Sequence, residues 1–253
     1  MHAFTALVRP PGLCFPQAIS DHPEKDKIDL SSAVIQHQHY VEALKQAGCK
    51  IISLPPEDNL PDATFVEDTA VIFEDTAVMC SMKEATRKNE MESVAKVLES
   101  YRKIERLKPP ANLDGGDILN TPEAIYIGLS KRSNESAAQS LSKLINKKII
   151  PVSVTQGLHL KSAVSYLGGN LLLINPLRVD SSTLKNFQWI EVEEKDAYAA
   201  NCLVLGNKII MSAGFPEVSE KIRPYGLEMI ELEMSEFEKA DGGVTCLSII
   251  LPI

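Results

Sequence analysis

Two residues of this 253-residue chain could together perform nucleophilic catalysis. Cys246 lies in DGGVTCLS, where neighbouring glycines would let a ligand approach the backbone, and His159 lies in GLHLKS. Taken singly, each has an ordinary structural explanation, because most free cysteines behave as small buried hydrophobic residues and a histidine at a strand start is usually a hydrogen-bonded core residue. A thiol and an imidazole brought to one place would form a nucleophile and its acid–base partner.

Acidic residues cluster in two further motifs and suggest what such a thiol would attack. PDATFVED contains Asp62, Glu67 and Asp68. NLDGGD contains Asp114 and Asp117, and any one of these residues could instead be a turn or capping residue. Several carboxylates would raise the pKa of a nearby thiol and oppose an oxyanion, which is unfavourable for a protease. They suit a guanidinium substrate, since carboxylate–guanidinium pairs are strong and directional, and the bound cation would stabilise the thiolate.

These motifs open a hairpin pattern that recurs along the chain. A polar cluster, a strand, a tight turn and a second strand recur from Val66, Gly115, His159, Ala200 and Gly242, at intervals of roughly 40–50 residues. The fifth unit lacks its second strand, which a strand over Phe4–Val8 could supply, so that the sheets close into a ring. We predict a five-bladed α/β propeller with pseudo-fivefold repeats, in one domain over residues 1–253. An ordinary open sheet is the alternative.

If the five units are equivalent, the polar residues at their starts meet near the pseudo-symmetry axis. Repeats that share a hydrophobic pattern but differ at their polar openings suggest a scaffold that carries a site. The residues expected there are Glu67, Asp68, Asp114, Asp117, His159, Asn201 and Cys246.

Helical periodicity fills most of the gaps between the hairpins. Ser31–Ser32 could cap a helix that ends near Gln46. The i, i+3, i+4, i+7 pattern from Met91 to Tyr101 predicts a second helix, and Asn134 is the candidate N-cap of a third. The residues expected to face inward from the first helix are Val34, Val41 and Leu44.

Composition and charge exclude several classes of protein. The chain is 44% hydrophobic and 24% charged, close to the globular average. Its net charge of −8, without a basic block, argues against nucleic-acid or anionic-membrane binding. No segment has the ~18 apolar residues of a membrane span, and no signal-peptide pattern is found. The five scattered cysteines favour free thiols in a reducing, cytoplasmic compartment.

The sequence gives no reason to expect a metal ion or a cofactor. His37 and His39 would point about 200° apart on a helix, and no other histidine or cysteine lies close enough in sequence to complete a zinc set. The phosphate-binding patterns GxGxxG and GxxxxGK[ST] do not occur. His2 and His22 are expected to be surface residues.

Taken together, the motifs resemble dimethylarginine dimethylaminohydrolases, of the guanidino-group-modifying (pentein) superfamily. The motifs are PDATFVED, NLDGGD, GLSKRSN, GLHLKS, AANC and DGGVTCLS, in order and with similar spacing over nearly the whole chain. FVED, HLK and the terminal TC-x-S are the most specific of them. The five-bladed α/β propeller of that superfamily agrees with the repeat pattern.

The resemblance implies a role for each matching residue. Cys246 would attack the guanidinium carbon, and His159 would protonate the departing dimethylamine and then activate the water that releases citrulline. Asp114 would orient the histidine. The remaining matches would bind the substrate: Asp62, Glu67 and Asp68 its guanidinium and amino groups, Arg87 and Arg132 its carboxylate, Ala240 through its backbone carbonyl, and Ile19 from a lid.

Some positions depart from the family pattern. Ala240 is smaller than the usual aliphatic residue, and Arg87 lies in EATRKNE rather than in a double-arginine motif. The early loop GLCFPQAIS matches the lid only at Ile19, after a gap. All three lie around the pocket mouth, so the reaction class is better defined than the substrate.

We therefore predict a cysteine hydrolase that needs no cofactor. It would convert N-methylated arginine, asymmetric dimethylarginine or monomethylarginine, to citrulline and dimethylamine or methylamine through a covalent thiouronium. An arginine deiminase or another guanidino hydrolase is the nearest alternative, because a pocket discriminates one methylene by only about 1–3 kcal/mol. A non-catalytic propeller that binds a partner is the alternative from another class. The apolar helix faces fit a monomer and a homodimer equally well.

Overall fold

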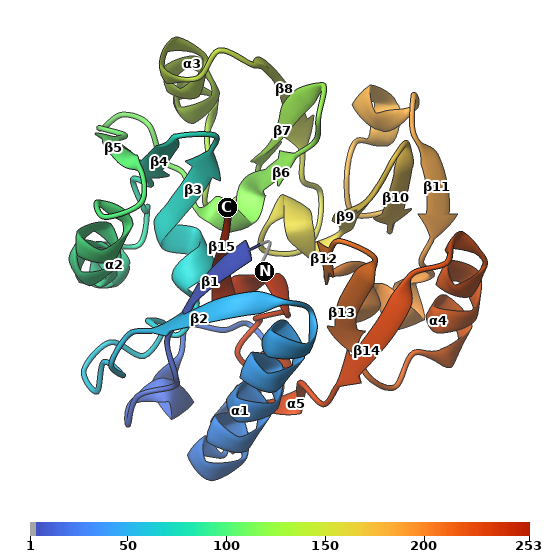
Figure 1. Ribbon diagram of the computed structural model, residues 1–253, viewed down its shortest axis with the longest axis horizontal. Coiled ribbons are helices and arrows are strands. Elements are labelled where there is room, and N and C mark those ends of the chain that lie inside the picture. The colour runs from blue at the N-terminus through green and yellow to red at the C-terminus, as the bar shows by residue number, and fades with distance from the viewer. Residues whose placement is uncertain (1–3) are drawn as a thin grey trace.

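The computed structural model describes residues 4–253 and contains five three-stranded sheets within that range (Figure 1). In each sheet, an antiparallel pair is joined by a third strand that runs parallel to the middle one. His2, and residues 1–3 of the predicted single domain, lie outside the described residues. The first three sheets in chain order are β3–β5 (Ala70–Phe73, Thr76–Met79, Lys103–Arg106), β6–β8 (Ile118–Asn120, Ala124–Leu129, Lys148–Ser153) and β9–β11 (Val164–Gly168, Leu171–Ile174, Gln188–Glu191). The other two are β12–β14 (Cys202–Leu205, Lys208–Ser212, Glu228–Leu232) and β15–β1–β2 (Ser248–Pro252, Phe4–Val8, Cys49–Ser53).

The two ends of the described chain close the ring. Strand β1 pairs antiparallel with β15, with Val8 opposite Ser248, and parallel with β2, with Phe4 opposite Cys49. An unpaired β15 would leave its backbone groups exposed at a sheet edge, and this pairing satisfies them. The predicted use of the N-terminal strand and the predicted five-bladed α/β propeller are confirmed.

The inner strands of the ring position the polar residues. Figure 1 shows β3, β6, β9, β12 and β15 around the centre, with the longer helices on the outside. A 3-10 helical turn precedes each inner strand, directly or with one residue between them, and four neighbouring pairs of these turns contact one another around the axis. These turns are Val66–Thr69, Gly115–Asp117, Leu160–Ser162, Glu194–Ala200 and Thr245–Leu247. The polar openings of the repeats therefore converge, as the sequence predicts.

Apolar side chains pack between neighbouring blades and hold them together. One such cluster joins Leu7 of β1 and Ile249 of β15 to Val94 and Leu98 of a helix of the next blade. Burial of apolar surface of this kind is the main favourable term in folding. The α-helices are α1 (Leu30–Gln46), α2 (Met91–Leu98), α3 (Glu135–Leu144), α4 (Pro216–Ile222) and α5 (Ser235–Glu238).

Helix α1 differs in detail from the prediction. Its N-cap is Asp29, whose side chain accepts a hydrogen bond from the Ser32 amide, so the predicted serine cap is wrong. Val34 and Val41 are only partly buried. The inward face is set by Tyr40, whose hydroxyl lies 2.7 Å from that of Ser248. The buried positions of this helix are Ala33, Gln36, His37, Tyr40, Ala43 and Leu44.

The other two predicted helices form with smaller differences. Helix α2 ends at Leu98, so Tyr101 lies beyond it and is partly exposed. Helix α3 is capped as predicted, because the Asn134 side chain accepts from the Ala137 amide. Between residues 4 and 253, no helix combines the length and the apolar character needed to cross a bilayer.

Replacement of Leu7 tests how much the closing strand contributes to stability. Leu7→Ala removes a fully buried side chain and should lower the free energy of unfolding by about 2–5 kcal/mol. Leu13 is 70% exposed, so Leu13→Ala should change it by less than about 0.5 kcal/mol. Urea denaturation of both variants measures the difference. Equal decreases in the free energy of unfolding for the two variants would mean that β1 does not contribute to the core.

Candidate active site

Cys246 follows Thr245 in the last of the five turns. Its sulfur accepts a hydrogen bond from the Gly243 amide at 3.3 Å, and its own amide donates to the Gly243 carbonyl. Burial raises the pKa of the Cys246 thiol, and the nearby carboxylates of Glu67 and Asp68 raise it further. In the absence of a bound cation the residue is therefore a thiol at neutral pH.

His159 lies directly before the turn Leu160–Ser162, and its ring faces two carboxylates. Its Nε2 atom is 3.2 Å from Asp114 Oδ2 and 3.9 Å from Asp68 Oδ1. Burial lowers the pKa of His159, but the charge of Asp68 and the hydrogen bond to Asp114 outweigh burial and raise it to about 9. The ring is thus an imidazolium at neutral pH and can donate a proton.

Asp68 is held in place by a buried arginine. Arg87 donates from Nη1 to Asp68 Oδ2 at 2.8 Å, from Nε and Nη2 to Glu90, and from Nη2 to two backbone carbonyls. Burial raises the pKa of Asp68, but the charges of His159 and Arg87 more than compensate and lower it to about 2. Asp68 is therefore ionised. Arg87 was predicted to contact a substrate carboxylate; it makes these bonds within the protein and also lines the narrow pocket described below, and the carboxylate contact stays a prediction.

Glu67 binds side chains of two other turns. Its Oε1 accepts from Lys161 Nζ and its Oε2 accepts from the Thr245 hydroxyl at 2.8 Å. Burial raises the pKa of Glu67, and Lys161 opposes that effect. The carboxylate thus ties the turn of Cys246 to the turn that follows His159.

A narrow pocket contains most of the predicted substrate-binding residues. Asp62 Oδ2 and Arg132 Nη1 are buried and have no hydrogen-bond partner among the described residues. Arg132 Nη1 lies 3.6 Å from Glu84 and 3.9 Å from Asp114. These distances allow ion pairs but are too long for hydrogen bonds. Two oppositely charged side chains with free bonding capacity in one pocket favour a zwitterionic ligand. The pocket is lined by Ile19, Asp62, Phe65, Asp68, Arg87, Arg132, Leu158, His159, Ala240, Asp241, Gly242 and Cys246.

The early loop covers this pocket from one side. The amide of Ile19 donates to Asp62 Oδ1 at 3.1 Å, and the Ser20 hydroxyl donates to the Lys239 carbonyl. The structure therefore places Ile19 at the pocket, as the resemblance implies. Ala240 also lines the pocket, and its side chain is buried.

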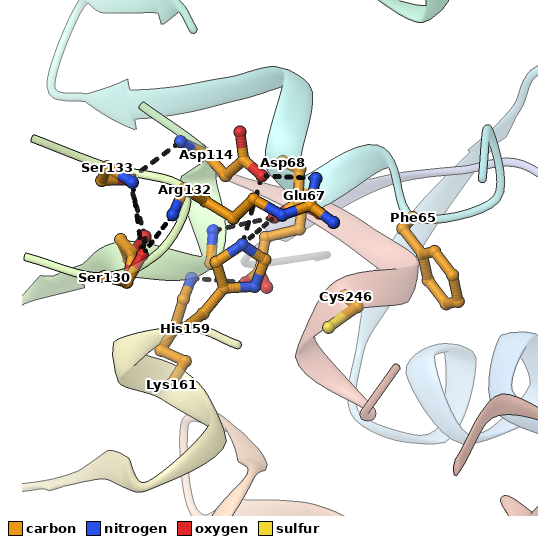
Figure 2. A network of polar contacts seen from close by, with 12 residues as sticks. Phe65, Glu67, Asp68, Asp114, Ser130, Arg132, Ser133, His159, Lys161 and Cys246 are labelled. Carbon is orange, nitrogen blue, oxygen red and sulfur yellow. Dashed lines mark hydrogen bonds and ion pairs between the residues drawn. The ribbon is translucent and has the colours of Figure 1, made fainter. Parts of the chain in front are cut away.

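Figure 2 shows how the two reactive side chains lie. The sulfur of Cys246 points towards the side of the site that holds His159, and the ring of Phe65 lies on the other side of the cysteine (Figure 2). A Cβ atom on Gly242 would come within 2.3 Å of the Phe65 ring, so this glycine lets the ring sit against the cysteine loop. Phe65 was missed by the sequence analysis, although its position inside FVED, next to two candidate residues, could have indicated it.

Asp117 binds the residue that follows His159 and two serine hydroxyls. Its Oδ1 accepts from the Leu160 amide at 2.8 Å, and its Oδ2 accepts from the hydroxyls of Ser130 and Ser133 at 2.6 Å each. These hydrogen bonds fix the backbone that follows His159. Neither serine was predicted, although both lie in the motif GLSKRSN, because only Arg132 of that motif was considered and the serines are 13 and 16 residues from Asp117 in sequence. Figure 2 shows both serines at the left of the view, on the side of His159 away from Cys246.

The site carries more acidic than basic side chains, so it suits a cation. Asp68, Asp114 and His159 also offer ligand atoms within 4.8 Å of one another, a spacing that a metal ion could use. The imidazole nitrogen of that group already lies against Asp114. The expectation that the protein needs no metal stays a prediction. The acidic groups are Asp62, Glu67, Asp68, Glu90, Asp114 and Asp117, and the basic ones are Arg87, Arg132, His159 and Lys161.

Comparison with known proteins identifies relatives over nearly the whole chain. Residues 17–252 match the family model described as N,N dimethylarginine dimethylhydrolase, eukaryotic. N(G),N(G)-dimethylarginine dimethylaminohydrolase of Pseudomonas aeruginosa is 34% identical over 228 residues, which cover 88% of this chain and 90% of the relative. The Streptomyces coelicolor protein of the same name is 33% identical over 251 residues, 97% and 96% of the two chains.

A solved structure has the same fold. The P. aeruginosa protein, as a cysteine-to-serine variant complexed with citrulline, superimposes with a TM-score of 0.94 and 29% sequence identity. The superposition covers 99% of this chain and 100% of the other.

The pKa of His159 can be tested by NMR titration of its imidazole. We expect a value near 9, and a fall in Asp68→Asn, because that change removes the carboxylate charge that raises it most. The protein unfolded in urea, where the ordinary value of about 6.5 should apply, is the reference. A pKa that is the same in the wild type and in Asp68→Asn would contradict this electrostatic assignment.

The same shift fixes the sign of one contribution to stability. The pKa of His159 is higher in the folded state than in the unfolded state, so its charge stabilises the fold fully below about pH 6.5. That contribution is lost as the pH rises from about 6.5 through 9.

Proposed function

Because the chain belongs to the dimethylarginine dimethylaminohydrolase family, we propose that it hydrolyses N-methylated arginine through Cys246. The products are citrulline and dimethylamine or methylamine. The observation that carries the proposal is the pair of buried atoms without a hydrogen-bond partner at the narrow pocket, Asp62 Oδ2 and Arg132 Nη1. They match the ammonium and carboxylate groups of an amino acid, and Asp68 and Cys246 in the same pocket match its guanidinium.

Binding of the substrate prepares the nucleophile. His159 already carries its proton at neutral pH, so it is a poor acceptor for the proton of the thiol. The guanidinium offsets the negative charge of the carboxylates around Cys246, which lowers the pKa of the thiol, and the proton leaves to solvent. The thiolate attacks the guanidinium carbon and forms a C–S bond, giving a tetrahedral adduct.

His159 then completes both halves of the reaction. It donates its proton to the departing dimethylamine as the C–N bond breaks, which leaves a covalent thiouronium on Cys246. The neutral imidazole takes a proton from water, whose oxygen attacks the same carbon. The C–S bond breaks, citrulline leaves, and the sulfur regains a proton. The sum is substrate plus water to citrulline plus amine.

Other residues support these steps. Asp114 orients the imidazolium of His159 from 3.2 Å, and the Arg87 guanidinium keeps Asp68 ionised for the substrate cation. Ile19 and Ala240 line the pocket, where Ile19 would cover the substrate and Ala240 would contact it through its backbone carbonyl. Glu67 acts on the substrate by its charge, since both its oxygens already accept hydrogen bonds from the protein.

The proposed compartment is the cytoplasm, supported by five free cysteines. The proposed partner is the small cationic substrate alone. A homodimer remains compatible with the exposed apolar residues of the helices.

A product assay tests the reaction and its nucleophile. With asymmetric dimethylarginine, the protein should release citrulline and dimethylamine in equal amounts. Cys246→Ser should abolish both, because a hydroxyl is a far weaker nucleophile than a thiol. Cys14→Ser, at another partly buried cysteine, should remain active. Citrulline from arginine alone would place the protein among deiminases, and undiminished turnover in Cys246→Ser would contradict the assignment.

Arg132→Ala tests the proposed carboxylate contact. It should raise KM by about 10- to 100-fold with a small change in kcat, because such a contact stabilises bound substrate and transition state alike. Steady-state kinetics measure the split, with Arg106→Ala, on the surface, as the control. A fall in kcat at unchanged KM would instead place Arg132 at the reacting atoms.

A further inference from the structure

Asn201 is a buried residue at the axis that takes no part in the proposed reaction steps. It follows the turn Glu194–Ala200 and directly precedes β12, in the blade that lies between those of His159 and Cys246. Its side chain has one acceptor and two N–H donors, and all three are engaged. Its partners belong to the two neighbouring blades rather than to its own.

On one side, Asn201 binds the residue before the nucleophile. Its Oδ1 accepts from the Thr245 amide at 3.0 Å, and its Nδ2 donates to the Thr245 hydroxyl at 2.9 Å. That hydroxyl in turn donates to Glu67. Both the backbone and the side chain of Thr245 are thus fixed, and with them the start of the turn that carries Cys246.

Asn201 also touches the glycine whose amide supports the sulfur. A Cβ atom on Gly243 would lie 2.4 Å from Asn201 Oδ1, so only glycine fits at this approach. The Gly243 amide donates to Cys246 Sγ at 3.3 Å. The position of Asn201 therefore bears on the hydrogen bond that stabilises a thiolate.

On the other side, Asn201 binds the turn of the histidine. Its Nδ2 donates to the carbonyl of Lys161 at 2.9 Å, two residues beyond His159. The turn of the histidine and the turn of the cysteine come from blades that are not adjacent in the chain order, β9–β11 and β15–β1–β2. Asn201 joins the two turns directly.

We propose that Asn201 is a positioning residue that sets the geometry between Cys246 and His159 by bridging Thr245 and Lys161. The proposal rests on the proposed role of Cys246 as the nucleophile. Bond formation at sulfur and proton transfer at the imidazole must occur on one substrate carbon, so a small displacement of either turn slows the reaction. A misplacement of about 1 Å can cost ~100-fold in rate.

The test compares Asn201→Ala with Asn175→Ala. Asn175 is also fully buried, and its side chain donates to Glu194 and accepts from the Leu177 amide, away from the narrow pocket. Both substitutions should lower the melting temperature by similar amounts. Asn201→Ala alone should lower kcat by about 10- to 100-fold with KM within about threefold, and should slow alkylation of Cys246 by iodoacetamide at fixed pH.

A second variant breaks the bridge from the other end, in case Asn201→Ala does not fold. Thr245→Val keeps the shape of the side chain but removes the hydroxyl that links Asn201 to Glu67. It should lower kcat in the same way. If both single variants fold, the fold-decrease in kcat of the double variant should be much smaller than the product of the two separate fold-decreases, because both changes break one bridge.

Each outcome decides the proposal. A fall in kcat no larger in Asn201→Ala and Thr245→Val than in Asn175→Ala, or a change confined to KM, overturns it. Wild-type turnover that disappears in Cys246→Ser shows that the reaction itself is as proposed, so a failure of the Asn201 prediction then concerns positioning alone. A wild-type protein without turnover overturns the proposed function first.

Discussion

The excess of buried negative charge at the axis is the constraint on which the site depends. Glu67, Asp68 and Asp114 are brought together there, and all three are buried away from water. Burying charges is costly unless they are paired, and the protein pairs them with Arg87, Lys161 and an imidazolium at His159. Burial raises the pKa of the Cys246 thiol and the negative field of Glu67 and Asp68 raises it further, so that Cys246 stays protonated until a cation binds. A thiol in such a field reacts with cationic substrates in preference to neutral ones.

The five repeated blades bring these charged side chains together. Each inner strand begins after a single 3-10 turn, and closing the sheets into a ring points the five turns at one axis. Different residues at equivalent positions then take different tasks: acid pair, histidine support, histidine, bridge and nucleophile. The ring closes only because β1 completes the last blade, so the site depends on contacts between the two ends of the described chain.

Sequence reasoning predicted what is local and repeated. The hairpins and the convergence of their openings followed from strand patterns, and Asn134 as a cap from its own helix. What depends on distant partners was missed. The amide of the α1 cap residue Asp29 donates to Glu236, and the inward face of α1 is set by Tyr40 against Ser248, both partners more than 200 residues away. Likewise, nothing near Arg87 in sequence reveals that Asp68 and two carbonyls occupy its guanidinium.

The most direct test of this electrostatic account is the reactivity of Cys246 towards two alkylating agents of similar size, neutral iodoacetamide and a cationic haloacetamidine. Peptide mapping would follow modification of this cysteine alone, from pH 6 to 10. The account predicts that at neutral pH the cationic reagent reacts far faster, while iodoacetamide becomes effective only as the pH rises. Equal rates with the same pH dependence would show that the carboxylates do not control the thiol, and would contradict the account.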